Sequence, residues 1–181
     1  MTNLNYGTAM KAKRWKPVIM TLLLAMAGQS LADSVPAAYN MAVIKDDAYG
    51  MTVMSGNYGK GIDKINAFSG KRARSFPAKT NLCVAYTMSR DFDNAEAACE
   101  AALTISEKYG KYGDSPISPN NRSRDQAMAY SNRGVLRAMT GDYAGAKQDF
   151  EYASELSKSF EAPEINLARL TTKEDASLSS L

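Results

Sequence analysis

The chain has 181 residues, with 22 Lys and Arg against 19 Asp and Glu, and it contains no His. The absence of His removes the commonest general base and the commonest protein ligand for metals. Ser–His–Asp and Cys–His catalysis are therefore excluded, as are zinc sites that require His. We expect a protein that is not an enzyme and that has no catalytic residues, cofactor or metal.

Residues 1–32 have the pattern of an export signal. A basic stretch at 11–16 precedes a mostly apolar run at 18–27, and Ser30 and Ala32 supply small side chains for a cleavage site. The apolar run is shorter than the about 20 residues that span a bilayer, so a retained membrane anchor is the weaker alternative. We expect a periplasmic or secreted protein without stable membrane insertion after signal removal.

Cleavage after residue 32 also changes the charge balance. The segment holds four Lys or Arg and no Asp or Glu, so the remaining chain has 18 basic and 19 acidic residues, a net charge of −1. Without a basic excess there is no electrostatic footprint for nucleic acid, and we expect no such partner. Met10 is an alternative start that would still leave an ordinary signal. The residues that follow the signal suffice for one domain with a hydrophobic core.

A five-residue phrase recurs three times in the remaining chain. Its copies are Met54-Ser55-Gly56-Asn57-Tyr58, Met88-Ser89-Arg90-Asp91-Phe92 and Met139-Thr140-Gly141-Asp142-Tyr143. They are 34 and 51 residues apart, and a period near 34 is typical of stacked helix–turn–helix units. Each copy predicts a turn between two antiparallel helices. Gly56 and Gly141 allow the positive φ that ends a helix, and Asn57, Asp91 and Asp142 can cap the next one.

The third unit places small residues where paired helices must approach closely, at Gly134, Ala146 and Ala153, with Phe150 between them. In this pattern the units resemble tetratricopeptide repeats. The resemblance implies an all-α fold, a short right-handed α-solenoid of about three helix–turn–helix hairpins in a domain spanning 33–170. The hairpins are expected near 42–70, 76–108 and 124–157, followed by a capping helix at 163–170 and a flexible tail at 171–181.

The longer step between the second and third units reflects an insertion near Tyr109–Ser123. This stretch is rich in turn-forming residues. It predicts either an extended loop or a slightly lengthened preceding helix followed by a loop. Such an insertion can join a binding face or serve only as a connector.

Cys83 and Cys99 lie at nearly equal distances from the turn of the second unit. An antiparallel hairpin would therefore place them side by side. Export to an oxidising compartment would allow a disulfide bond between them. The alternative is a pair of reduced, buried cysteines that pack as small apolar residues.

Asn81 and Asn132 occupy the same place in units two and three. The resemblance implies that this position faces a concave groove, where an Asn amide can bond the backbone of a bound peptide. Val84 and Met128 are further candidates for this groove. The neighbouring residues lack the basic side chains of a carboxylate clamp, so an extended segment or a helix is the expected ligand. The alternative is that both asparagines bond across neighbouring helices.

These patterns predict a non-enzymatic protein–protein interaction scaffold of the cell envelope, which binds a protein or peptide segment on its concave face. The alternative is a structural or assembly component of an envelope complex that acts through self-association. The identity of the partner and the oligomeric state are left open by the sequence.

Overall fold

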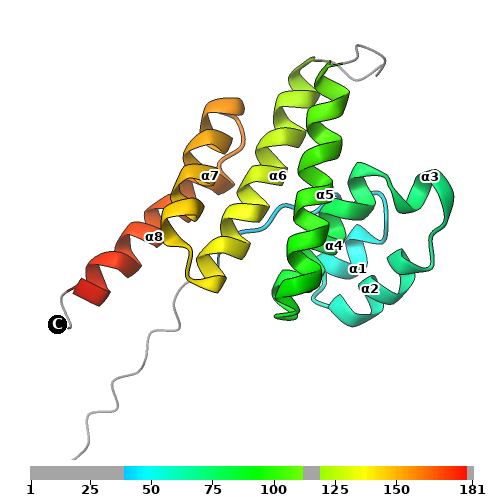
Figure 1. Ribbon diagram of the computed structural model, residues 1–181, viewed down its shortest axis with the longest axis horizontal. Helices are drawn as coiled ribbons and strands as arrows, with labels where there is room; N and C mark the ends of the chain where they lie inside the picture. Colours follow the sequence, from blue (N-terminus) through cyan, green and yellow to red (C-terminus); the bar gives the residue numbers. More distant parts are fainter. Residues whose placement is uncertain (1–38, 112–118, 179–181) are drawn as a thin grey trace, which may run out of the picture. The chain divides into compact units, whose positions relative to one another are not determined.

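The structure is a computed structural model that describes residues 39–111 and 119–178. Within these ranges the chain is all-α, with eight helices and no strand (Figure 1). The helices are α1 (Gly50–Met54), α2 (Tyr58–Asn66), α3 (Gly70–Ala73), α4 (Phe76–Met88), α5 (Phe92–Lys111), α6 (Pro119–Thr140), α7 (Tyr143–Leu156) and α8 (Ala162–Leu178). The predicted signal at 1–32 lies outside the described residues.

From α4 onward, each helix packs against the next one in the sequence. Small residues make the closest of these contacts possible. A Cβ added to Gly134 of α6 would lie 2.6 Å from the ring of Phe150 on α7, so only glycine allows this approach. Phe150 itself is fully buried, together with Ala146 and Ala153 on the same helix. The small-residue positions of the third unit therefore form the contact between α6 and α7.

Gly56 and Gly141 have the predicted positive φ angles, of 81° and 93°, and the predicted capping side chains bond at two of the three turns. Asp142 caps α7 by accepting a hydrogen bond from the Gly145 N–H at 2.9 Å. Asp91 accepts a longer bond, of 3.5 Å, from the Asn94 N–H at the start of α5. The prediction for Asn57 is wrong, because its side chain makes no capping bond to α2.

The predicted start of the first unit is wrong, whereas the lengthened preceding helix, one of the two alternatives predicted for the insertion, is present. The chain between residues 42 and 48 is not helical, and the first helix of that unit is reduced to α1. The insertion mainly lengthens its two neighbouring helices, since α5 continues to Lys111 and α6 begins at Pro119. Proline is well suited to the first helical position, where its missing N–H costs nothing. Residues 112–118 of the predicted loop lie outside the described residues.

The C-terminal boundary was also predicted wrongly. α8 continues to Leu178, through most of the stretch expected to be a flexible tail. No Gly or Pro follows Pro163 to stop the helix. The hydroxyls of Thr171 and Thr172 donate to the carbonyls one turn earlier, at 3.1 and 2.9 Å.

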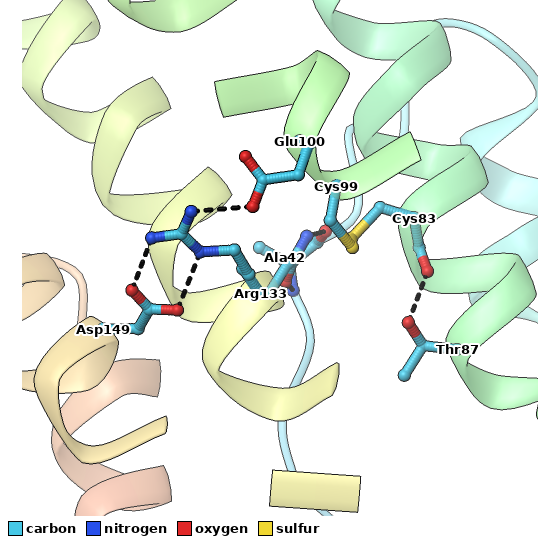
Figure 2. The surroundings of a disulfide bond; sticks show 8 residues. Ala42, Cys83, Thr87, Cys99, Glu100, Arg133 and Asp149 are labelled. Carbon is cyan, nitrogen blue, oxygen red and sulfur yellow. Dashed lines mark hydrogen bonds and ion pairs between the residues drawn. A yellow bond between two sulfur atoms is a disulfide. The ribbon is translucent and has the colours of Figure 1, made fainter. Parts of the chain in front are cut away.

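Cys83 of α4 and Cys99 of α5 form a disulfide bond, with the two sulfur atoms 2.05 Å apart (Figure 2). This agrees with the predicted pairing. Both residues are buried in the cluster that joins α4 to α5. A buried disulfide of this kind indicates an oxidising, extracytoplasmic compartment. Among the described residues, none of the helices combines the length and the hydrophobicity needed to cross a membrane.

Replacing both cysteines by alanine should lower the free energy of unfolding by about 3 kcal/mol, because the bond restricts the unfolded chain. Urea unfolding under oxidising conditions measures this change. A reductant should weaken the wild-type protein similarly but leave the double variant unaffected. Alkylation of the denatured protein without prior reduction should leave its intact mass unchanged, and uptake of the reagent by the unreduced protein would contradict the disulfide.

Candidate functional site

Residues 39–44 form an extended segment that lies along α4, α6 and α8. Figure 1 shows its blue-to-cyan trace passing beside α6. The segment has no helix or strand assigned to it, so its main-chain N–H and C=O groups need partners elsewhere. Side chains of the three helices supply these partners.

Three asparagine side chains each bind both the N–H and the C=O of one residue in this segment. In each pair the amide Oδ1 accepts from the main-chain N–H, and Nδ2 donates to the carbonyl of the same residue. The pairs are Asn166 with Asn40 (2.7 and 2.8 Å), Asn132 with Ala42 (2.7 and 2.9 Å) and Asn81 with Ile44 (2.9 and 3.1 Å). We call Asn81, Asn132 and Asn166 the asparagine ladder.

The ladder imitates the edge of a β-strand. It binds every second residue, and an extended chain turns the N–H and C=O of alternate residues to the same side. The three asparagines are completely buried or nearly so. Because all six bonds go to main-chain atoms, this contact sets the position and direction of the segment without selecting its side chains.

Asn81 and Asn132 thus bind an extended main chain, and the alternative in which they bond across neighbouring helices is wrong. The segment that they hold belongs to this chain itself. The other two groove candidates, Val84 and Met128, are both buried. Val84 belongs to the cluster against which Met41 and Val43 of the segment pack. With the segment in place, neither candidate is open to an external ligand.

Asn166 was missed by the sequence reasoning, which treated its helix as a cap. The signal that would have found it is the repeat period itself. Asn166 follows Asn132 by 34 residues, and Ala168 stands two residues further on, as the small residue Gly134 does on α6. In this respect α8 repeats the first helix of the third unit.

Apolar side chains anchor the segment on both sides of the ladder. Met41 packs against two buried clusters, one that joins α4 to α5 and another that joins α6, α7 and α8. The ring of Tyr39 stacks near Phe150, with 6.3 Å between the ring centroids. Val43 packs against the first cluster. Ile44 packs against a third buried cluster on α4, α5 and α6, and Asn40 Oδ1 accepts a hydrogen bond from Arg169 at 3.1 Å. Side chains at the ladder positions therefore contact the helices as well as those at positions 39, 41 and 43.

A tight turn at residues 45–49, which we call the hinge, joins the segment to α1. Asn81 Nδ2 also donates to the carbonyls of Asp47 at 3.0 Å and Ala48 at 3.2 Å. Ala48 and Tyr49 have positive φ angles of 45° and 55°, a conformation that costs a non-glycine residue about 1–2 kcal/mol. A Cβ at Gly50 would overlap the carbonyl of Ile44. The hinge is therefore both strained and closely packed.

A charge network centred on the buried Asp149 adjoins the ladder on α6. The Asp149 carboxylate, on α7, accepts bonds from Arg133 Nε and Nη2 at 2.9 and 2.8 Å and from Arg137 Nη1 at 2.9 Å. Arg133 Nη1 also donates to Glu100 of α5 at 2.8 Å, so its guanidinium lies between two carboxylates (Figure 2). The network therefore joins α5, α6 and α7 beside the ladder residue Asn132, which Arg133 follows directly in the sequence.

Burial alone would lower the pKa of Arg133. The hydrogen bonds and charges of Asp149 and Glu100 outweigh that effect and raise the pKa above its ordinary value. Burial also raises the pKa of Tyr130 to about 12, assisted by the hydrogen bond that its hydroxyl donates to Glu107. Both side chains therefore remain protonated hydrogen-bond donors through the neutral pH range.

Comparison with known proteins identifies no relative: no family model, no curated protein and no solved structure matches the chain. The function is therefore argued from the geometry of the ladder and of the segment that it holds.

Replacing Asn132 by alanine should lower the free energy of unfolding by about 3 kcal/mol, because it removes two hydrogen bonds and leaves both polar groups of Ala42 without partners. Urea unfolding measures the loss, and hydrogen exchange at the Ala42 amide should become faster. The control Asn57→Ala, at an exposed turn, should change stability by less than about 0.5 kcal/mol. Equal effects from the two substitutions would contradict the role of the ladder.

Replacing Asp149 by asparagine should cost about 3 kcal/mol of stability, because two partly buried guanidinium groups lose their shared counter-charge. Thermal or urea unfolding measures this change. The matched control is Glu151→Gln, which removes an exposed ion pair with Lys147 of 4.0 Å and should cost less than about 1 kcal/mol. A stability of Asp149→Asn equal to that of the control would show that the network is dispensable.

Proposed function

We propose that this protein is a non-enzymatic interaction scaffold of the cell envelope, whose asparagine ladder binds an extended segment of a partner protein. The observation that carries the proposal is the occupied groove. Six hydrogen bonds hold alternate residues of an extended chain through main-chain atoms alone. Any extended segment presents the same atoms at the same spacing, so a partner can meet the ladder as the chain's own segment does.

In this proposal the architecture is a short right-handed α-solenoid of tetratricopeptide-like hairpins. Two observations support it. Consecutive helices pack against each other from α4 onward, and the ladder asparagines recur at the repeat step, 51 and then 34 residues apart. The helices α4, α6 and α8 would then be equivalent first helices, lining one face with one asparagine each.

The segment also indicates which partner sequences would fit. Tyr39, Met41 and Val43 enter the apolar contacts, whereas Asn40 is exposed. A partner segment would therefore need apolar side chains at the positions equivalent to these three residues and at that of Ile44, which packs against a third cluster. The partner class is an extended protein segment with that apolar pattern, in the same oxidising compartment, either periplasmic or secreted.

The chain's own segment competes with such a partner. A tethered ligand acts at an effective concentration on the order of millimolar, so an untethered segment must bind tightly, or be locally concentrated, to replace it. Self-association is the second candidate function. It is favoured by the fact that the ligand seen in the groove comes from this same chain.

A synthetic, fluorescently labelled peptide with the sequence of residues 39–45 tests the proposal. It should bind saturably to the variant Met41→Asp/Val43→Asp, whose own segment is weakened while its ladder is intact. Binding to the wild-type protein should be at least about tenfold weaker, because the tethered segment competes. Fluorescence anisotropy measures both affinities, and circular dichroism checks that the variant keeps its helices.

Two modified peptides test whether the ladder is the binding site. N-methylation at Ala42 removes an N–H that the ladder binds and should abolish binding. N-methylation at Met41 is the control, since that N–H bonds to none of the described residues, and it should largely preserve binding. Equal binding of both peptides, or none of the unmodified peptide to a folded variant, would refute the proposed function.

A further inference from the structure

We infer that the partner segment for this groove can come from a second copy of this chain. In that dimer each chain places its residues 39–44 on the asparagine ladder of the other. The inference rests on the proposed function, because it requires the ladder to bind a segment in trans. It goes further in two ways. It names the partner as a second copy of this chain, and it gives the hinge the role of controlling the exchange.

The first argument is that the fit of this segment is already seen within one chain. All six ladder bonds join the segment to α4, α6 and α8. Tyr39, Met41 and Val43 pack against clusters that come mainly from α4 to α8, with Ala48, Val53 and Ile65 as further members. None of these contacts depends on the connection between the segment and α1. A segment from a second copy would therefore restore each of them.

The second argument is that the closed hinge holds its backbone in an unfavourable conformation. Ala48 and Tyr49 are consecutive non-glycine residues with positive φ, which L-residues adopt only at a cost. Gly50 lies so close to the Ile44 carbonyl that any side chain there would overlap it. Opening the hinge releases both constraints, and binding in trans then recovers the groove contacts. This balance favours exchange of identical segments between two chains.

One contact acts in the opposite direction. Asn81 Nδ2 also holds the Asp47 and Ala48 carbonyls of the closed hinge, and tethering favours the segment of the same chain. The monomer with its own segment bound is thus the form expected at low protein concentration. The exchanged dimer should form as the concentration rises, or when the hinge is biased towards opening.

A matched pair of substitutions at Tyr49 tests the hinge. Tyr49→Gly and Tyr49→Ala both remove the side chain and its stacking with Phe68, but only glycine accepts the positive φ without strain. The dimer association constant should be at least about tenfold lower for Tyr49→Gly than for Tyr49→Ala. Sedimentation velocity at a series of equal concentrations, after equilibration, measures both constants.

Gly50→Ala tests the hinge in the opposite direction. It should force the turn open and raise the dimer fraction above that of the wild-type protein. The control is Gly59→Ala on α2, where an added Cβ meets no atom within 4 Å, and it should leave the dimer fraction unchanged. If Gly50→Ala does not fold, the Tyr49 pair decides.

Complementation identifies what is exchanged. One variant, Asn132→Ala/Asn166→Ala, keeps the segment but damages the ladder. The other, Met41→Asp/Val43→Asp, keeps the ladder but damages the segment. Mixing them should give heterodimers, detected by native mass spectrometry, in excess of either homodimer, because only the mixed pair joins an intact segment to an intact ladder.

The outcomes separate this inference from the proposed function. Exchange is overturned if all hinge variants remain monomeric, if the Tyr49 pair gives equal association constants, or if mixing gives no excess of heterodimer. Saturable binding of the 39–45 peptide in the same experiments would leave the proposed function standing. Failure of that peptide to bind would contradict both the proposed function and the exchange.

Discussion

The structure depends on the pairing between buried asparagine amides and an extended main chain. A buried amide must satisfy both Oδ1 and Nδ2, and an extended segment without strand partners must satisfy its N–H and C=O groups. Asn132 and Ala42 satisfy both requirements at once, because the amide of one bonds to the N–H and the C=O of the other. The same pairing recurs on α4 and α8, so three helices are joined through one segment rather than only through contacts between neighbours.

This constraint connects stability with binding. The ladder contributes to the fold because its ligand is present, and its chemistry is suited to other segments because it contacts only main-chain atoms. Side-chain selection is left to the apolar positions of the segment, of which Met41 is the most central because it packs against two clusters. The strained hinge at Ala48 and Tyr49 then determines how firmly the segment stays in its own chain.

Features governed by local geometry could be predicted. Cys83 and Cys99 lie on either side of one tight turn, so the hairpin alone brings them together. The equivalence of Asn81 and Asn132 follows from the repeat period, and the same period would have predicted the position of Asn166. The helix predicted for the start of the first unit failed for a different reason. In residues 40, 42 and 44 the main-chain groups bond to distant asparagines instead of to a helical turn. A local sequence pattern does not reveal such distant partners.

The helical class, the positions of the turns, the closeness of the two cysteines and the positions of two ladder residues could all be predicted from the sequence, because each depends on neighbours along the chain or on a regular period. What occupies the groove depends instead on the tertiary structure. The contacts that decide it join residues 126, 90 and 37 positions apart, and the folded helices bring them together. The ladder bonds go to main-chain atoms, which every sequence carries, so the occupant became evident only when the helices and the segment were seen together.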